Sequence, residues 1–459
     1  MAKPHIHLTT VQRHRLEGIR RAPSQLRAKR LMLYAFRMGG DLDVPRFRQA
    51  FATVVHWHEP LRLALPDLDP ATGRLVDVAE VMRQFTVVAA EREEDVHDLV
   101  QEVFDRPIDH RRGVLFHAVL ARLAPDVHVF VFGVDHLVFD RFSAQVLMTQ
   151  LGEVYVASLS GLPDPSGPRI GFWDAAARQD RATGERTASF WHDQFDRFGL
   201  EPRLHLPERS PGSAGAMGPG ARVAHSWPLP VGSGFEAVFA RLRMTLFELG
   251  LAALLAADTA TGAIQVGAVV PLANRPEPWG HELIGFFSHP VNVYAELPPD
   301  LTVLCAAEVV REAFRAAVHH SGVPMRELYS QRDPNYADRL APGAYLYCDF
   351  LDTGPDRVPF GPVHIAPFEL DDSMVLRNHG AVNVMVTRRR RRGGSTAGGS
   401  LDLWARYSVE AFREDTVRDY LARAASFLQA LATDPTVRLG ALGATGPWRI
   451  GEVERGRDW

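Results

Sequence analysis

A histidine and an aspartate at positions 136 and 140, His136 and Asp140, have the side chains and spacing for acid–base chemistry. An imidazole has an unperturbed pKa near neutrality, so a positioned histidine can accept and return a proton during a reaction. With 19 histidines in 459 residues, about one His-x-x-x-Asp pair is expected by chance. The spacing alone makes His136 a candidate and does not establish its use.

A second pair with this spacing, His192 and Asp196, has a different setting. It lies in a polar pattern of helical period after Trp191, where residues four apart merely touch on the helix surface. We therefore interpret the second pair as structural.

The elements around His136 are predicted from hydrophobic periodicity. Residues 115–120 and 127–132 are apolar, β-branched and aromatic runs, which predict two strands joined by a turn at residues 124–126. Residues 142–151 have apolar positions at helical spacing. His136 is thus expected in a connection between a strand and a helix.

The rest of the chain reads as mixed helices and strands in two lobes. Apolar periodicity predicts helices over residues 44–58, 246–257 and 417–432, a long helix from Phe172 onward, and a strand over 264–270. Glycine and proline cluster in residues 158–168, the best linker candidate. The predicted fold class is α/β, with domains over residues 1–170 and 171–459.

Composition excludes several classes of function. A formal charge of −4 and a pI near 6.6 provide no basic field for nucleic acid. The first residues lack an apolar signal segment, and residues 246–257 are too short to span a bilayer, so we expect a cytoplasmic protein without a membrane partner. Cys305 and Cys348 lack zinc or disulfide spacing and are expected to be buried thiols; no metal site is predicted.

The most biased segment is the arginine run 388–392, followed by glycine and serine up to residue 400. A solvated loop between two strands is the favoured interpretation. An anion-binding patch that meets an acidic carrier helix is the alternative.

Several segments, in order along the chain, resemble motifs of the condensation domains of nonribosomal peptide synthetases. Asp135–Ser143 resembles the HHxxxDGxS motif of that family, and His58–Arg62 resembles its HExLR motif. Further similar segments are Phe104-Asp105 with Gly113–Phe116, Met244–Phe247, Val266–Arg275, Gly285–Phe287 and Leu403–Phe412. The resemblance covers almost the whole chain.

The resemblance implies a chloramphenicol-acetyltransferase-like fold, with two lobes in a V-shaped pseudo-dimer and a tunnel between them. His136 would position or deprotonate an amine or alcohol that attacks an acyl thioester. Asp140 would be structural, paired in bidentate fashion with Arg275, and Ser143 would lie beside them. Backbone N–H groups near the start of the following helix would stabilise the carbonyl oxygen.

The resemblance also implies the acyl donor of the reaction. The acyl group would arrive on the phosphopantetheine of an acyl or peptidyl carrier protein, or on coenzyme A, and no other cofactor is expected. No adenylation or carrier segment accompanies the domain, so the chain is expected to be a free-standing enzyme of secondary metabolism.

Three residues depart from the family motifs: Asp135 replaces the first histidine, Arg141 the glycine, and His289 the asparagine of GxFxN. Asp135 could orient a neighbour by hydrogen bonding. Arg141 and His289, together with Asp349, are predicted to line the tunnel or contact substrate. Asp349 is the first residue of a segment that partly matches the DFGWG motif of plant-type acyltransferases.

Arg141 leaves alternatives open. A long side chain in place of glycine would narrow the tunnel, which would fit an inactive condensation-like domain that recruits other enzymes to an assembly line. Its planar guanidinium could instead bind an anionic group of the substrate. Catalysis is the favoured interpretation, because the chain retains His136, Asp140, Ser143 and Arg275.

Overall fold

The structure is a computed structural model of the chain. It describes residues 6–21, 31–68, 73–180, 185–210, 213, 217–229, 242–275, 277–333, 335–336, 344–352, 360–368, 377–379, 381–390 and 399–442.

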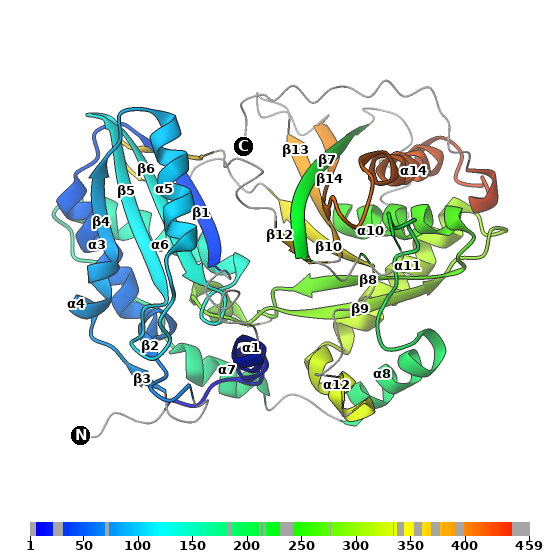
Figure 1. Cartoon of the computed structure of the whole chain (residues 1–459), viewed down its shortest axis with the longest axis horizontal. Coiled ribbons are helices and arrows are strands. Elements are labelled where there is room, and N and C mark those ends of the chain that lie inside the picture. Colours follow the sequence, from blue (N-terminus) through cyan, green and yellow to red (C-terminus); the bar gives the residue numbers. More distant parts are fainter. Residues whose placement is uncertain are drawn as a thin grey trace.

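Two lobes, each built on its own β-sheet, lie side by side (Figure 1). The first lobe contains a five-stranded sheet in the order β11-β1-β6-β5-β4. Its strands are β1 (Leu31–Gly39), β4 (Phe85–Ala89), β5 (Phe116–Ala124), β6 (Val127–Asp135) and β11 (His364–Pro367). Strand β6 is central and apolar on both faces, which is why it reads as a nearly continuous hydrophobic run.

Helices cover both faces of this first sheet. Helices α3 (Val44–Trp57) and α6 (Arg141–Leu159) pack on one face in a core rich in phenylalanine. On the other face α5 (Glu93–Asp105) places Val96, Val100 and Val103 against the sheet. The central strand β6 is therefore buried, and its end is a rigid base for the connection that carries His136.

The second lobe contains a seven-stranded sheet in the order β12-β7-β14-β13-β10-β8-β9. Its strands are β7 (Met217–Leu229), β8 (Gln265–Leu272), β9 (His289–Glu296), β10 (Tyr345–Asp352), β12 (Arg377–His379), β13 (Ala381–Arg390) and β14 (Gly399–Ser408). Helices α10 (Leu246–Asp258), α11 (Val303–His319) and α14 (Glu414–Thr433) form the core with this sheet. Helix α10 begins at a capping box of Thr245 and Glu248.

Shorter elements complete the lobes and their connections. They are α1 (Thr10–Arg21), η1 (Glu59–Arg62), β2 (Leu63–Ala64), β3 (Arg74–Leu75), α4 (Val78–Val81), η2 (Met82–Gln84), α7 (Phe172–Asp180), α8 (Glu185–Phe198), η4 (Thr259–Thr261), η5 (Pro278–Glu282), α12 (Met325–Arg332) and η7 (Leu439–Ala441).

The structure agrees with most of the elements expected from periodicity. The hairpin of β5 and β6 and the helices α3, α6, α10 and α14 lie where the patterns predict them, although α6 continues to Leu159. The long helix expected from Phe172 is described as two helices, α7 and α8; residues 181–184 lie outside the described residues.

The boundary expected near residue 170 is crossed by one segment of the chain. Strand β11 follows most of the second lobe in sequence, yet it pairs antiparallel with β1, with Phe36 opposite Pro367 and Gly39 opposite His364. Phe360 also packs against Phe47 in the first lobe. The boundary itself stays a prediction.

Two smaller expectations need correction. Cys348 is buried, but Cys305 is exposed because it lies on the outer face of α11. The arginine run begins inside a strand, since β13 extends to Arg390 and pairs with β14; residues 391–398 lie outside the described residues.

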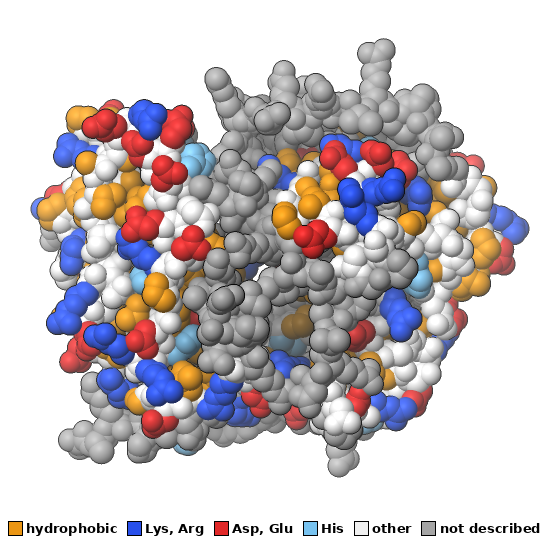
Figure 2. Space-filling view, viewed as in Figure 1, with side chains coloured by type: hydrophobic (Ala, Val, Ile, Leu, Met, Phe, Trp, Pro, Cys, Tyr) orange, Lys and Arg blue, Asp and Glu red, His pale blue; other side chains and the backbone are white. Residues whose placement is uncertain are grey.

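The surface carries both signs of charge. On the face shown in Figure 2, acidic and basic side chains are interspersed over both lobes. No helix among the described residues is long and apolar enough to cross a membrane.

Candidate active site

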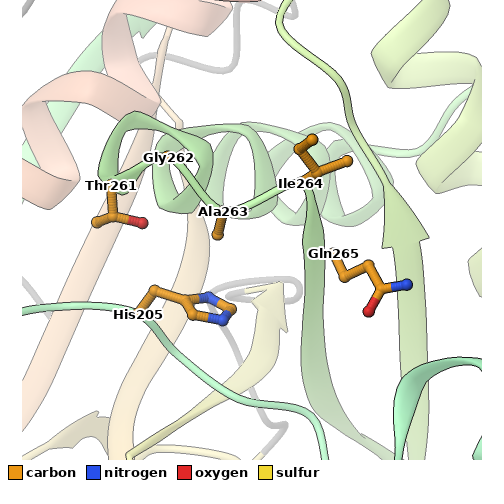
Figure 3. Close-up of a pocket in the computed structure, with 6 residues that line it drawn as sticks. All are labelled: His205, Thr261, Gly262, Ala263, Ile264 and Gln265. Carbon is orange, nitrogen blue, oxygen red and sulfur yellow. The ribbon is translucent and has the colours of Figure 1, made fainter.

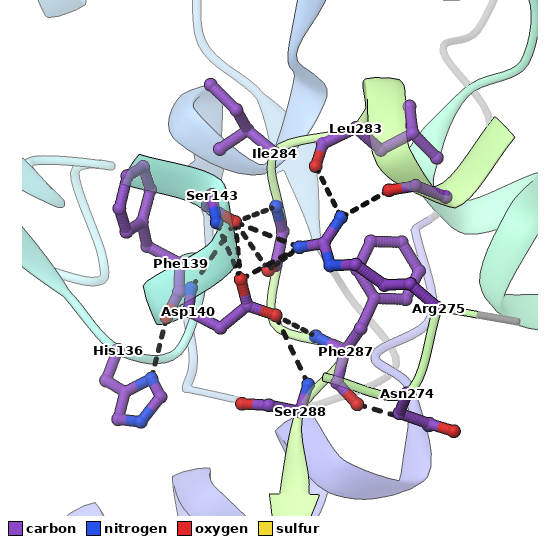
Figure 4. A network of polar contacts seen from close by, with 12 residues as sticks. His136, Phe139, Asp140, Ser143, Asn274, Arg275, Leu283, Ile284, Phe287 and Ser288 are labelled. Atoms are coloured by element: carbon purple, nitrogen blue, oxygen red, sulfur yellow. Dashed lines mark hydrogen bonds and ion pairs between the residues drawn. The ribbon is translucent and has the colours of Figure 1, made fainter. Parts of the chain in front are cut away.

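The connection between β6 and α6 holds His136 and Asp140 in place (Figure 4). Asp140 is the N-cap of α6, with φ −123° and ψ 177°, and its carboxylate accepts the backbone N–H of Ser143 at 2.9 Å. Capping by a short carboxylate satisfies one of the unpaired donors at the helix start. The local sequence therefore fixes where the helix begins and the direction in which Asp140 points.

Asp140 is fully buried and accepts hydrogen bonds from both lobes. Arg275 Nη2 donates to Asp140 Oδ1 at 2.8 Å, and the backbone N–H groups of Phe287 and Ser288 donate to Asp140 Oδ2 at 3.2 and 3.3 Å. Ser143 Oγ lies 2.8 Å from Asp140 Oδ1 and 3.0 Å from the Gly285 carbonyl. A buried carboxylate requires such a set of donors, because burial removes its water.

Arg275 is equally enclosed. Its Nη1 donates to the carbonyl oxygens of Gly280 and Leu283 at 2.6 Å each, and its guanidinium lies 4.4 Å from the centre of the Phe287 ring. Asp140 and Arg275 thus form the ion pair that the resemblance implies. The contact joins one nitrogen to one oxygen, so the expected bidentate geometry is wrong, since Nη1 binds carbonyls instead.

The ring of His136 has a fixed tautomer. Its Nδ1 donates to the Phe139 carbonyl at 2.6 Å, which leaves Nε2 with a lone pair (Figure 4). Burial, together with the positive charge of Arg15, lowers the pKa of His136 to about 4. The hydrogen bond to the Phe139 carbonyl and the negative charges of Asp140 and Asp135 raise this pKa, but by less. The imidazole is therefore neutral at pH 7 and can accept a hydrogen bond at Nε2.

Asp135, beside His136, belongs to a separate contact network. It is buried and accepts His110 Nε2 at 3.0 Å and the Leu137 N–H at 2.6 Å. Burial alone would raise the pKa of Asp135, but the His110 hydrogen bond and the charges of His110 and Arg15 hold it below its usual value. Asp135 therefore anchors the start of the connection to the first lobe.

Arg141, the first residue of α6, reaches the other lobe. Its Nη1 lies 2.7 Å from Asp349 Oδ2 on β10 and 3.2 Å from the sulfur of Met385 on β13. The side chain of Arg141 is 42% exposed and that of Asp349 24% exposed. The two predicted tunnel residues thus meet each other across the lobes.

His289, the third predicted tunnel residue, is turned into the second lobe. It is buried, and its Nε2 donates to the Ser321 carbonyl at 2.6 Å. Burial lowers the pKa of His289, so a neutral ring holds β9 to the segment after α11. Its role toward substrate stays a prediction.

The buried His58 holds the loop around Ile284 in place through hydrogen bonds. The Ile284 N–H donates to His58 Nδ1 at 3.2 Å, and His58 Nε2 donates to Gln150 Oε1 at 2.6 Å. Gln150 in turn donates to the Glu282 carbonyl at 2.8 Å. The HExLR-like segment thus holds the loop that supplies the acceptors of Arg275, a role that the sequence pattern did not reveal.

Four further residues near the site, Arg15, Gln12, Tyr34 and Tyr347, carried no signal in the sequence. Arg15 on α1 acts electrostatically on both His136 and Tyr347 of β10, and Arg141 acts on Tyr347 and on Tyr34 of β1. Gln12, one turn before Arg15, donates to the Leu137 carbonyl at 3.0 Å and ties α1 to the connection. Only the packing of the two lobes brings these residues together.

Other candidate positions lie away from His136. Asp196 of the second His-x-x-x-Asp pair forms an ion pair with Arg332 of α12. A surface hollow of about 560 Å³ beside η4 is lined by His205, Thr261, Gly262, Ala263, Ile264 and Gln265 (Figure 3). His205 Nδ1 donates to the buried Asp258 at 2.8 Å. No cluster of three metal-binding side chains occurs within the described ranges.

A family model described as the condensation domain matches residues 9–341, which is more than half of the chain. The chain belongs to the condensation-domain family. Among relatives of this family, isonitrile lipopeptide synthase of Mycobacterium tuberculosis is 24% identical over 434 residues, 90% of this chain and 17% of the relative. Malpinin synthetase of Mortierella alpina is 25% identical over 417 residues, 88% of this chain and 6% of the relative. The chain therefore spans a small part of the length of these relatives.

Solved structures of condensation domains share the fold. The X-domain in complex with OxyB from teicoplanin biosynthesis gives a TM-score of 0.77 at 23% identity, covering 97% of both chains. The first condensation domain of the calcium-dependent antibiotic synthetase, with a substrate analogue, gives 0.69 at 18% identity, covering 96% of this chain and 99% of that domain. These matches confirm the predicted two-lobed, chloramphenicol-acetyltransferase-like fold.

Proposed function

We propose that this condensation domain transfers an acyl group from a thioester to an amine or alcohol in natural-product biosynthesis. The observation that carries the proposal is the state of His136: a neutral ring with Nδ1 bound to the Phe139 carbonyl and Nε2 left as an acceptor. An acceptor nitrogen of this kind can orient a nucleophile and take its proton.

The proposed reaction needs few groups. The nucleophile donates its N–H or O–H to His136 Nε2 and attacks the thioester carbonyl. A C–N or C–O bond forms, the C–S bond breaks, and the thiolate leaves with the proton that His136 received. The carbonyl oxygen, which gains charge, is expected to accept hydrogen bonds from backbone N–H groups near the start of α6.

The proposed acyl donor is tethered to phosphopantetheine on an acyl or peptidyl carrier protein, or to coenzyme A. Both carry the same thioester, so the chemistry at His136 is the same for either. The chain itself needs no other cofactor in this proposal, because neither the attack nor the loss of the thiol changes an oxidation state.

The test is acyl transfer by purified wild type and by His136→Ala, with carrier-bound and coenzyme A donors and a panel of amines and alcohols. Loss of the general base should lower the rate by about 100-fold or more. His192→Ala, in the other His-x-x-x-Asp pair, is the matched control and should keep full activity. Equal product from wild type and His136→Ala would reject the catalytic proposal.

The Arg141–Asp349 contact between the lobes favours a second candidate, an inactive domain that recruits other enzymes. A side chain that joins the two lobes from the start of α6 would narrow the path of a substrate. Pull-down of pathway enzymes, combined with no transfer from any donor, would support recruitment. Transfer that depends on His136, without capture of any enzyme, would reject it.

A further inference from the structure

The guanidinium of Arg141 has more donors than its contacts use. A guanidinium carries five N–H donors in a planar fork. Among the described residues, the contacts of Arg141 are to Asp349 and to the sulfur of Met385, and both involve Nη1. With 42% of the side chain exposed, Nε and Nη2 remain available to a ligand.

A second donor lies close by. Tyr34 packs on Phe139, and the centres of the two rings lie 5.8 Å apart. Phe139 precedes Arg141 by two residues in the chain. The Tyr34 hydroxyl is buried and has no hydrogen-bond partner within the part of the chain that the structure describes. The charges of Arg141 and Asp349 both act on its pKa, which burial raises. A buried hydroxyl without a partner is unfavourable, so a ligand that accepts its hydrogen bond is stabilised.

Among the described residues, each carboxylate oxygen of Asp349 already accepts a hydrogen bond. Asp349 Oδ2 accepts from Arg141, and Asp349 Oδ1 accepts the N–H of Phe350 at 2.8 Å. The cluster of Arg141 and Tyr34 therefore has donors in excess. A carboxylate, with two oxygens and no donor, is complementary to such a cluster and matches the fork of a guanidinium.

We propose that Arg141 and Tyr34 bind a free carboxylate of the acceptor, so that the acceptor is an amino acid or a hydroxy acid. This inference rests on the proposed acyl transfer. His136 Nε2 accepts the N–H or O–H of the nucleophile, and Arg141, from the same β6–α6 connection, holds the carboxylate.

The neighbouring charges fit this arrangement. Asp349 neutralises part of the charge of Arg141, but the positive charges of Arg15 and Arg141 both act on Tyr347. A second carboxylate near Tyr347 would therefore be favoured by the positive charge of both arginines. An acceptor whose carboxyl group is tied in a thioester, an ester or an amide lacks the negative charge that these groups recognise.

The test compares acids with their amides. A panel of α-amino acids and α-hydroxy acids, each beside its own carboxamide, is offered with one acyl donor. Wild type should prefer the acid by about tenfold or more in kcat/KM, as charge-assisted hydrogen bonds allow. Arg141→Gln should remove the preference, because it lowers kcat/KM for the acid more than for the amide, and Tyr34→Phe should reduce the preference in part.

The matched control is Arg418→Gln. Arg418 also pairs with a carboxylate, Glu414, and is 40% exposed, but it lies on α14. The control should keep the preference of the wild type. Asp349→Asn should keep or raise the preference, because it removes a competing carboxylate. An identical loss in Asp349→Asn and Arg141→Gln would mean that the contact only joins the lobes and would overturn the proposal.

A binding measurement separates this inference from the proposed reaction. Saturation-transfer NMR on His136→Ala, with the same acids and amides as probes, needs no turnover. Selective binding of the acids that is lost in Arg141→Gln supports the carboxylate site even if no acyl transfer is found. Equal binding of acid and amide, or selectivity that survives in Arg141→Gln, overturns the site.

Discussion

Two histidines, the buried His58 and the partly buried His136, are held neutral. Burial lowers the pKa of each to about 4. Each has one ring nitrogen that donates, His58 to Gln150 and His136 to the Phe139 carbonyl. The difference lies at the other nitrogen: His58 Nδ1 accepts the Ile284 N–H, whereas His136 Nε2 has no hydrogen-bond partner among the described residues.

These histidines should make stability depend on pH. In the unfolded chain each of these histidines binds a proton below its ordinary pKa of 6.5. In the folded chain the same histidines stay neutral down to about pH 4. The free energy of unfolding should therefore fall as the pH drops from 6.5 towards 4, by about 1.4 kcal/mol per pH unit for each fully neutral buried histidine. Above pH 6.5 the two histidines are neutral in both states, so they no longer change the free energy of unfolding with pH.

Urea unfolding at pH 7.5, 6 and 5 measures this dependence. Other groups titrate in the same range, so the contribution of His136 is read from the difference between wild type and His136→Ala. The variant should lose less stability on acidification. Parallel curves for the two proteins would contradict a depressed pKa at His136.

At the scale of single residues, the site residues that could be predicted from the sequence lie in contiguous motifs. His136, Asp140 and Ser143 lie in or directly after one short connection, and Arg275 follows strand β8 in a segment that the family resemblance identifies. The contact of Arg141 with Asp349, and the places of Arg15 and Tyr34, depend on how the lobes meet. Hydrophobic periodicity describes each strand or helix alone, so it carries no information on such contacts.

Among the elements, the loop from Leu283 to Ser288 is the part that joins the site together. It supplies acceptors to Arg275, donors to Asp140, and an N–H to His58. At Gly285 the loop passes directly over the ring of Phe172 on α7, where an added Cβ would lie 2.2 Å from two ring carbons. The glycine is needed for close approach.

Gly285→Ala should therefore destabilise the protein by about 1–3 kcal/mol, because an overpacked core must shift. The cost should be smaller in a Phe172→Leu background, and thermal unfolding of the four proteins of this double-mutant cycle measures the coupling. Gly39→Ala is the control, since an added Cβ there meets nothing within 4 Å, and its effect should stay within about 0.5 kcal/mol. Equal costs in both backgrounds would contradict the clash.

The elements show where prediction from sequence stops. Strong patterns, such as the hairpin of β5 and β6 or the helix α14, could be predicted from period alone. Strand β11 has four residues and no distinctive period, and its partner β1 lies at the other end of the chain. Such a pairing follows from the fold and not from local pattern.

At the scale of the whole molecule, the return of residues 360–368 ties the lobes together. Residues 1–170 alone lack β11, so one edge of β1 has no strand partner, and Phe360 no longer packs in the core. An unpaired edge strand favours association with other chains. In gel filtration the fragment 1–170 should elute as oligomers or aggregates.

Co-expression with residues 171–459 is the control for that fragment. The second fragment supplies β11 in trans and should restore a one-to-one complex of the size of the intact protein. A stable, monomeric fragment 1–170 with the unfolding free energy of the full chain would contradict a structural role for β11.

The pairing of β1 with β11 also sets an order of events during synthesis. The ribosome produces β1 before β11, and more than 300 residues separate the two strands. At about 5–20 residues per second, the nascent first lobe waits for roughly 20–60 s with an open edge. Protection of that edge during translation, by a chaperone or by transient contacts, is therefore a requirement that this topology places on the cell that makes the protein.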